Sequence, residues 1–182
     1  MDATTLLLTR QSDPRLIAPA PSAQQLEFIK KAALKVPDHG GLTPWRFIVV
    51  QGDGLTRLGD IFHRSAIAEQ QSDKVIARAK QLPVRAPMVI IAIAKYQAHP
   101  KVPRIEQLQS AGCALFAMQQ AAFSLGLGGI WRTGYFAQSN AVKAALNCEY
   151  EDEIVGYLYL GTPEVAIQKP VRHQPDYFFE DF

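Results

Sequence analysis

The strongest constraint on the fold is the run of residues 106–125, which predicts one long helix with apolar side chains around almost its whole circumference. A surface helix normally keeps its apolar side chains on one face and its polar side chains on the other. Here the apolar members are spread over all faces: Ala111, Cys113, Leu115, Phe116, Met118, Ala121, Ala122 and Phe123. We therefore expect this helix to be buried, either at the centre of the molecule or at an interface between subunits.

Other apolar segments predict the strands of a central sheet. Residues 46–51, 88–94 and 154–160 are rich in β-branched and other apolar side chains, and residues 130–131 begin a further short strand. Helices are expected over residues 3–11, 22–35, 55–82 and 141–146. Because helices and strands alternate, we expect one layered α/β or α+β domain that spans residues 1–182.

Composition excludes several classes of protein. Of 182 residues, 48% are apolar and 20% are charged, which are values for a globular chain. The net charge of +2 gives no electrostatic footprint for nucleic acid or for an anionic membrane. The longest apolar run, Met88–Ala94, is far shorter than the roughly 20 residues of a membrane helix, and residues 1–5 lack the basic start of a secretory signal. We therefore expect a cytoplasmic protein that binds neither nucleic acid nor membrane.

The chain's own acids, bases and thiols form no recognisable catalytic or metal centre. The four histidines are scattered, without the spacing of a metal site. Cys113 lies in the apolar helix and is expected to be an inert core thiol, while Cys148 stands beside Glu149 rather than a cation. The sequence therefore predicts no metal and no catalytic side chain, and it favours a borrowed cofactor.

Two short segments carry groups suited to such a cofactor. Arg10-Gln11-Ser12 offers a guanidinium fork and a hydroxyl to a phosphate, although such a triplet alone is more often a surface turn. Trp131-Arg132-Thr133-Gly134 offers an aromatic plane, a cation and a hydroxyl, although a buried tryptophan beside a surface arginine explains it equally well. Gly126-Leu127-Gly128-Gly129 follows a helix rather than a strand, so it predicts a helix stop and not a dinucleotide fingerprint.

Taken together, the order and spacing of these motifs resemble the flavin-dependent nitroreductases, and within them the short NAD(P)H nitroreductases. The resemblance covers nearly the whole chain. Its markers are Arg10-Gln11-Ser12, Pro37-Asp38-His39 with Pro44-Trp45, Lys101-Val102-Pro103-Arg104 with Glu106-Gln107, Ser110-Ala111-Gly112-Cys113-Ala114, Gly128-Gly129-Ile130-Trp131-Arg132 and Tyr159-Leu160-Gly161-Thr162-Pro163.

The resemblance implies an α+β fold, a sandwich in which helices flank a central mixed sheet. It also implies an intertwined homodimer that holds FMN at the subunit interface. By likeness, Arg10, Gln11 and Ser12 hold the FMN phosphate and ribityl end from one subunit. Lys35 and His39 match positions that reach the same FMN from the other subunit.

Two further segments acquire a role through the same likeness. Trp131, Arg132 and Thr133 match a third stretch that contacts FMN. Residues matching a segment assigned to the nicotinamide nucleotide are Ala121, Ala122, Phe123, Ser124, Leu125 and Gly126. A cation such as Arg132 or Lys35 near flavin N1 and C2=O would stabilise negative charge there.

The resemblance implies an FMN-dependent NAD(P)H oxidoreductase that reduces nitroaromatic, quinone or related electron-poor small molecules. Hydride moves through flavin N5 in this chemistry, so no catalytic acid or base is required. NADH or NADPH would be the reductant. Two alternatives stay open at this point: an FMN enzyme with another physiological acceptor, and an FMN-binding dimer without turnover.

Overall fold

The computed structural model describes residues 1–165 and 173–182. Its regular elements, in chain order, are α1 (Ala3–Thr9), β1 (Leu16–Ile17), α2 (Ala23–Ala33), η1 (His39–Gly41), β2 (Trp45–Gln51), α3 (Asp53–Ala68), α4 (Asp73–Ala79), η2 (Pro83–Arg85), β3 (Met88–Ala94), α5 (Arg104–Ser124), β4 (Gly128–Arg132), α6 (Tyr135–Gln138), α7 (Asn140–Ala145), β5 (Glu153–Pro163) and η3 (Pro175–Tyr177). Among these described residues, no helix is both long and apolar enough to cross a membrane.

The strands form one sheet in the order β1-β5-β3-β2, and β4 also pairs with β5. The long strand β5 therefore organises the sheet, since it has β3, β4 and β1 as partners along its length. Every strand pair among the described residues is antiparallel, whereas we expected a mixed sheet. The sequence pattern marks the position of each strand but not its direction relative to its neighbours. The expectation of parallel pairs was therefore wrong.

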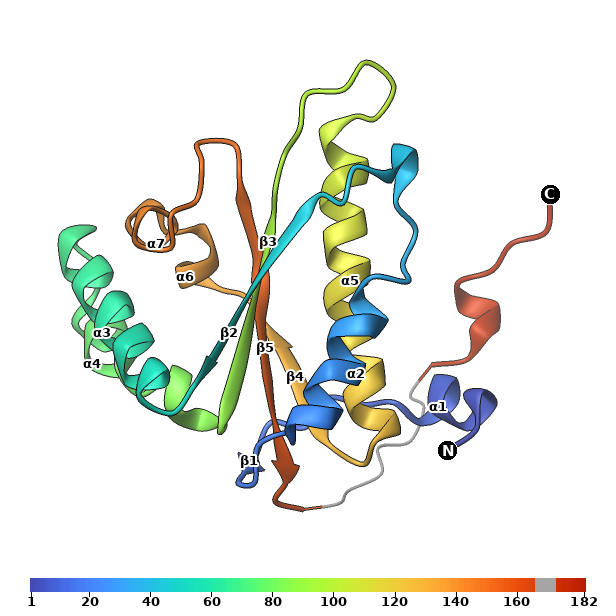
Figure 1. Cartoon of the computed structure of the whole chain (residues 1–182), viewed down its shortest axis with the longest axis horizontal. Coiled ribbons are helices and arrows are strands. Elements are labelled where there is room, and N and C mark those ends of the chain that lie inside the picture. The colour runs from blue at the N-terminus through green and yellow to red at the C-terminus, as the bar shows by residue number, and fades with distance from the viewer. Residues whose placement is uncertain (166–172) are drawn as a thin grey trace.

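Helices cover both faces of this sheet (Figure 1). One face carries α2 and α5, whose buried side chains pack on alternate residues of β3 and β5, such as Ile90 and Leu158. The other face carries α3, α4, α6 and α7, which pack around Phe62, Ile91 and Tyr157. β3 is buried at every position, which explains why its sequence is apolar without alternation.

The apolar helix expected at residues 106–125 is present as α5, but the chain covers only part of its surface. Ala114, Leu115 and Met118 are buried, whereas Ile105 and Phe116 are 57% and 40% exposed. Cys113 is also exposed, so our expectation of a core thiol is wrong. The helical period explains the error, because Cys113 is rotated away from the face that meets the sheet. Within one chain, α5 therefore keeps an uncovered apolar face.

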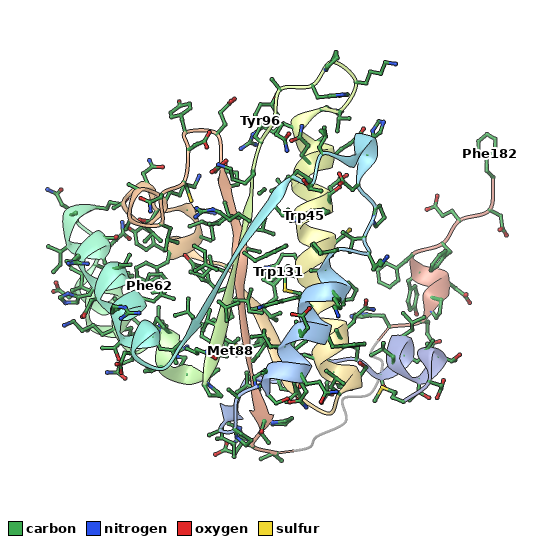
Figure 2. The ribbon with its side chains drawn as sticks, viewed as in Figure 1. Trp45, Phe62, Met88, Tyr96, Trp131 and Phe182 are labelled. Carbon is green, nitrogen blue, oxygen red and sulfur yellow. The ribbon has the colours of Figure 1, made fainter. Side chains whose placement is uncertain are left out.

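Both ends of the chain lie outside the layer that α2 and α5 form (Figure 1). In α1, Leu7 and Leu8 are 69% and 71% exposed, and the aromatic side chains of the C-terminal tail are similarly open. Figure 2 shows Phe182 projecting away from the body of the molecule. The aromatic tail, which we expected to dock on this chain or on a partner, therefore finds no cover within the described residues of one chain.

Candidate functional site

The segment after α1 is attached to the start of β4. Helix α1 ends where Arg10 caps it, and the chain then runs alongside β4, because the Asp13 N–H donates to the Gly129 carbonyl at 3.0 Å. The Arg10 guanidinium carbon lies 5.4 Å from the centroid of the Phe116 ring, on the uncovered face of α5. Among the described residues, no carboxylate forms an ion pair with Arg10. Arg10 thus presents a cation that can meet an anion.

A buried glutamine of α5 holds this segment in place. The Gln119 Nε2 donates to the Gly129 carbonyl at 2.9 Å and to the Ser12 Oγ at 3.3 Å, and Gln119 is only 3% exposed. One amide therefore connects α5, β4 and the Arg10-Gln11-Ser12 segment. Our sequence prediction missed Gln119, although a polar residue inside an apolar helix is the signal that could have found it.

The Gln11 Nε2 donates to Asp13 Oδ1 at 3.2 Å, and this bond shapes the same turn. Asp13 is 7% exposed, which is low for a carboxylate. Its backbone N–H already bonds to β4, so side chain and backbone together fix the path of residues 10–13. The expected phosphate-binding triplet is therefore an ordered segment rather than a loose surface turn.

The expected Trp131-Arg132-Thr133 stretch is divided between the two faces of the sheet. Successive side chains of a strand point to opposite faces. Trp131 packs with the cluster under α5, and in Figure 2 it lies between the sheet and α5. The Arg132 guanidinium instead lies over the Tyr159 ring, 5.8 Å from its centroid, on the face that carries α3. Thr133 is exposed just beyond the end of β4.

A β-bulge in β5 positions the Trp131 indole. The register against β3 shifts so that Ala92 pairs with Gly156 and Ile93 with Ile154, which leaves Val155 as the extra residue. The Val155 carbonyl accepts a hydrogen bond from Trp131 Nε1 at 3.2 Å. A Cβ at Gly156 would lie 2.7 Å from Trp131 Cδ1 and 2.8 Å from the Arg132 oxygen, so the close approach requires glycine.

His39 lies near the N-terminal end of α5, whereas Arg10 lies beside Phe116 in its second half. Lys35 is exposed just after α2, and His39 opens the short helix η1. Asp38 shapes this loop, because its carboxylate accepts from the backbone N–H groups of Leu42 and Thr43 at 3.1 and 2.8 Å. The His39 Nδ1 lies 2.6 Å from Glu106 Oε2, which anchors the ring to the first turn of α5.

Arg10 and His39, from the two groups of predicted ligands, are therefore not brought together within one chain. His39 is attached to Glu106 and Arg10 to Phe116, and these helix positions are ten residues apart. At a rise of about 1.5 Å per residue, the anchors stand about 15 Å apart along α5. An anion held by Arg10 is therefore out of hydrogen-bond reach of His39 in the same chain.

The segment matched to the nicotinamide nucleotide forms the end of α5 and the turn that follows it. Ala121 and Ala122 are 6% and 0% exposed and belong to the core, so they offer almost no surface to a nucleotide. Leu125 caps the helix, and Gly126 follows with φ of +78°, a value that favours glycine. Only these last two residues of the segment are exposed.

The cysteines and acidic residues do not form a separate catalytic centre. Burial raises the pKa of the Cys148 thiol, and the nearby Arg46 guanidinium opposes that rise only partly. Over the residues that the structure describes, no three His, Cys, Asp or Glu side chains are grouped so that they could hold a metal ion. The groups that remain suited to chemistry are cations, hydroxyls and aromatic rings along β4 and α5.

An antiparallel sheet, a long helix packed on it and an N-terminal segment bonded to β4 are the features to compare with known proteins. The model of the nitroreductase family matches residues 8–162, and the chain belongs to that family. The resemblance stated from the motifs is therefore confirmed.

In sequence, the chain is similar to YdjA of Escherichia coli strain K12, which is named as a candidate NAD(P)H nitroreductase. It is 47% identical over 172 residues, which are 94% of each chain. Among solved structures, a nitroreductase-like family protein from Bacillus cereus superposes with a TM-score of 0.87 at 20% identity, covering 100% of this chain and 96% of that one. A nitroreductase with bound FMN from Bacteroides fragilis gives a TM-score of 0.75 at 19% identity, and each chain is covered completely. These structures confirm the α+β fold.

Proposed function

We propose that this protein is an FMN-dependent NAD(P)H oxidoreductase that reduces nitroaromatic, quinone or related electron-poor molecules. The observation that carries the proposal is the Arg10-Gln11-Ser12 segment, held against β4 by Asp13 and Gln119 with its cation free of any described acidic partner. Membership of the nitroreductase family and the bound FMN of the Bacteroides fragilis neighbour support this proposal. The name of YdjA supports NAD(P)H as the reductant.

The residues present fit the chemistry of FMN, which combines a phosphate, a polyol and a planar ring. Arg10 and Ser12 supply a guanidinium and a hydroxyl for the phosphate end. The indole of Trp131 supplies an apolar surface for the ring. Held by these residues, FMN would supply hydride transfer at N5 between the nicotinamide and the acceptor. The protein aligns the reacting rings and excludes water.

The proposed cofactor site is shared between two copies of the chain, and the uncovered face of α5 explains how. If two copies meet through this face about a two-fold axis, their α5 helices run antiparallel. If the two-fold axis passes α5 at the level of residue 111, the first turn of the partner's α5 lies beside Phe116 of this subunit. Helices in contact lie about 8–10 Å apart, so His39 of the partner subunit would approach Arg10. Each FMN would then meet Arg10 from one subunit and Lys35 with His39 from the other.

A flavin spectrum followed by anaerobic addition of NADH or NADPH tests this function. We expect purified protein, after incubation with FMN and gel filtration, to keep a yellow flavin that bleaches when the nucleotide is added. An acceptor such as a nitroaromatic or a quinone should then restore the colour. A flavin that stays yellow with both nucleotides would support the alternative, a binding dimer without turnover. A protein that retains no FMN would refute both functions.

A further inference from the structure

A cavity on the sheet face that carries α3 lies outside the proposed cofactor site. It has a volume of about 380 Å³, which is within the range of small-molecule sites. Residues 130–134, along β4 and just beyond it, form the wall between the two, because Trp131 packs under α5 while Arg132 faces α3. In Figure 2, Phe62 and Trp131 accordingly lie on opposite sides of the sheet. Aromatic side chains from α3, α6 and β5 form another part of the lining: Phe62, Phe136, Tyr157 and Tyr159.

Three arginines from three different elements line this cavity. Arg78 belongs to α4, Arg85 to η2 and Arg132 to β4, and no aspartate or glutamate is among the described residues that line it. Over residues 1–165 and 173–182, none of the three forms an ion pair. Like charges around one small cavity repel one another, whereas an anion between them attracts all three. The charge of the lining therefore selects an anionic ligand.

Arg132 gives a second, independent sign of an anion site. Its Nε is buried and has no hydrogen-bond partner among the described residues. Native structures rarely keep a buried donor unpaired without a reason. Burial raises the pKa of Tyr159, and the charges of Arg132 and Arg85 oppose that rise, so guanidinium groups from β4 and η2 act on one phenol of the cavity wall. An anion beside Tyr159 is therefore within the field of both arginines.

We infer that this cavity, which we call the arginine pocket (Arg78, Arg85 and Arg132 around Tyr159), is a separate binding site for the phosphomonoester of a small ring compound. A phosphomonoester carries a charge of about −1.5 to −2 at neutral pH and three terminal oxygens, so it matches several guanidinium groups better than one carboxylate does. The aromatic lining suits a planar ring attached to the phosphate. Because the sheet stands between this pocket and the proposed flavin site, the ligand exchanges no electrons with the flavin, and the inference does not rest on the proposed function.

The test is a calorimetric titration of the FMN-loaded protein with three probes, namely phenyl phosphate, phenol and inorganic phosphate. We expect phenyl phosphate to bind about 10- to 150-fold more tightly than phenol, which is the effect of a charge-assisted hydrogen bond. Inorganic phosphate should bind more weakly than phenyl phosphate, because it makes no contact with the aromatic lining.

Two variants connect this preference with the pocket. Arg78→Gln and Arg85→Gln should each lower the preference for phenyl phosphate over phenol, and both should fold normally because both side chains are exposed. The control Arg57→Gln, at an exposed arginine of α3 that lines a different cavity, should keep the preference of the wild-type protein.

Equal affinity for phenyl phosphate and phenol, or an unchanged preference in either arginine variant, would overturn the inference. Inorganic phosphate bound as tightly as phenyl phosphate would overturn the ligand class, because the ring would then contribute nothing. FMN is itself a phosphomonoester of a ring compound, so flavin released during the titration is measured by its absorbance. Release of FMN by phenyl phosphate would show that the arginines serve the flavin, and the separate site would then be wrong.

Failure of the proposed function has a different signature. A protein that retains no FMN is titrated as purified, and phenyl phosphate binding that depends on Arg78 and Arg85 then supports the arginine pocket although the proposed function fails. A protein that retains FMN and is reduced by NADH or NADPH, yet binds phenyl phosphate no better than phenol, keeps the proposed function and loses the pocket.

Discussion

Replacement of Gln119 by leucine should lower the free energy of unfolding and also raise the Kd for FMN. The hydrogen bonds of Gln119 set the size of both effects. The Gln119 amide donates two hydrogen bonds, to Gly129 O and Ser12 Oγ, from a site that is 3% exposed. Each such bond contributes about 0.5–1.5 kcal/mol net, so the free energy of unfolding of the flavin-free protein should fall by about 1–3 kcal/mol. The Gly129 carbonyl keeps the Asp13 N–H as a donor, which limits the loss.

FMN affinity should fall separately, because Ser12 loses the hydrogen bond that its hydroxyl accepts from Gln119. The loss of about one neutral hydrogen bond corresponds to a Kd that rises roughly 2- to 13-fold. Titration of flavin-free protein with FMN, followed by flavin fluorescence, measures this Kd, and urea unfolding measures the stability. Gln24→Leu, at an exposed helical glutamine of α2, is the matched control and should change neither. An unchanged Kd with reduced stability would refute the positioning role of Gln119.

Three further perturbations test other contacts of the fold and the proposed interface. Gly156→Ala should lower the free energy of unfolding by about 1–3 kcal/mol and change the Trp131 fluorescence, because its Cβ would lie 2.7 Å from Trp131 Cδ1. Burial raises the pKa of Glu69, but hydrogen bonds from Tyr135 and the Ala141 N–H outweigh burial and lower it below its usual 4.5. Glu69→Gln should therefore cost about 1.5–3 kcal/mol at pH 7. In urea unfolding this difference should shrink as the pH falls from 4.5 through the lower pKa of folded Glu69, where the native carboxylate takes up a proton. Cys113→Glu should place like charges close to the proposed two-fold axis, so gel filtration should show a monomer that has lost FMN; a dimer that retains flavin would contradict the proposed interface.

The regular elements were predictable where local signals and burial agree. Ser22 caps α2 as expected, since its Oγ accepts from the Gln25 N–H at 3.2 Å. The strand expected over residues 88–94 has those bounds in the structure, because every one of its residues is buried and no polar position blurs its ends. The helix α5 was predictable in extent but not in burial, because its sequence is apolar on the face that one chain leaves uncovered.

The order of the motifs predicts a set of site residues but says nothing of their arrangement in space. Motif order indicated Arg10, His39 and Trp131, yet no local signal shows that α5 separates the first two by about 15 Å. Gln119 bonds to Ser12, which lies 107 residues away in the chain, so only the folded structure reveals that pair. Strand alternation could have separated Trp131 from Arg132, had the limits of β4 been known.

Each proposed FMN site combines residues from two copies of the chain, and a mixed dimer tests this arrangement most directly. One tagged variant carries Arg10→Glu, and a differently tagged variant carries Lys35→Glu with His39→Ala. Each homodimer should hold almost no flavin, because every site in it lacks one of its two groups. The tandem-purified mixed dimer should contain one doubly damaged site and one intact site, and therefore about half the flavin of the wild-type dimer. A mixed dimer as empty as the two homodimers, or a wild-type monomer that retains flavin, would contradict the shared site.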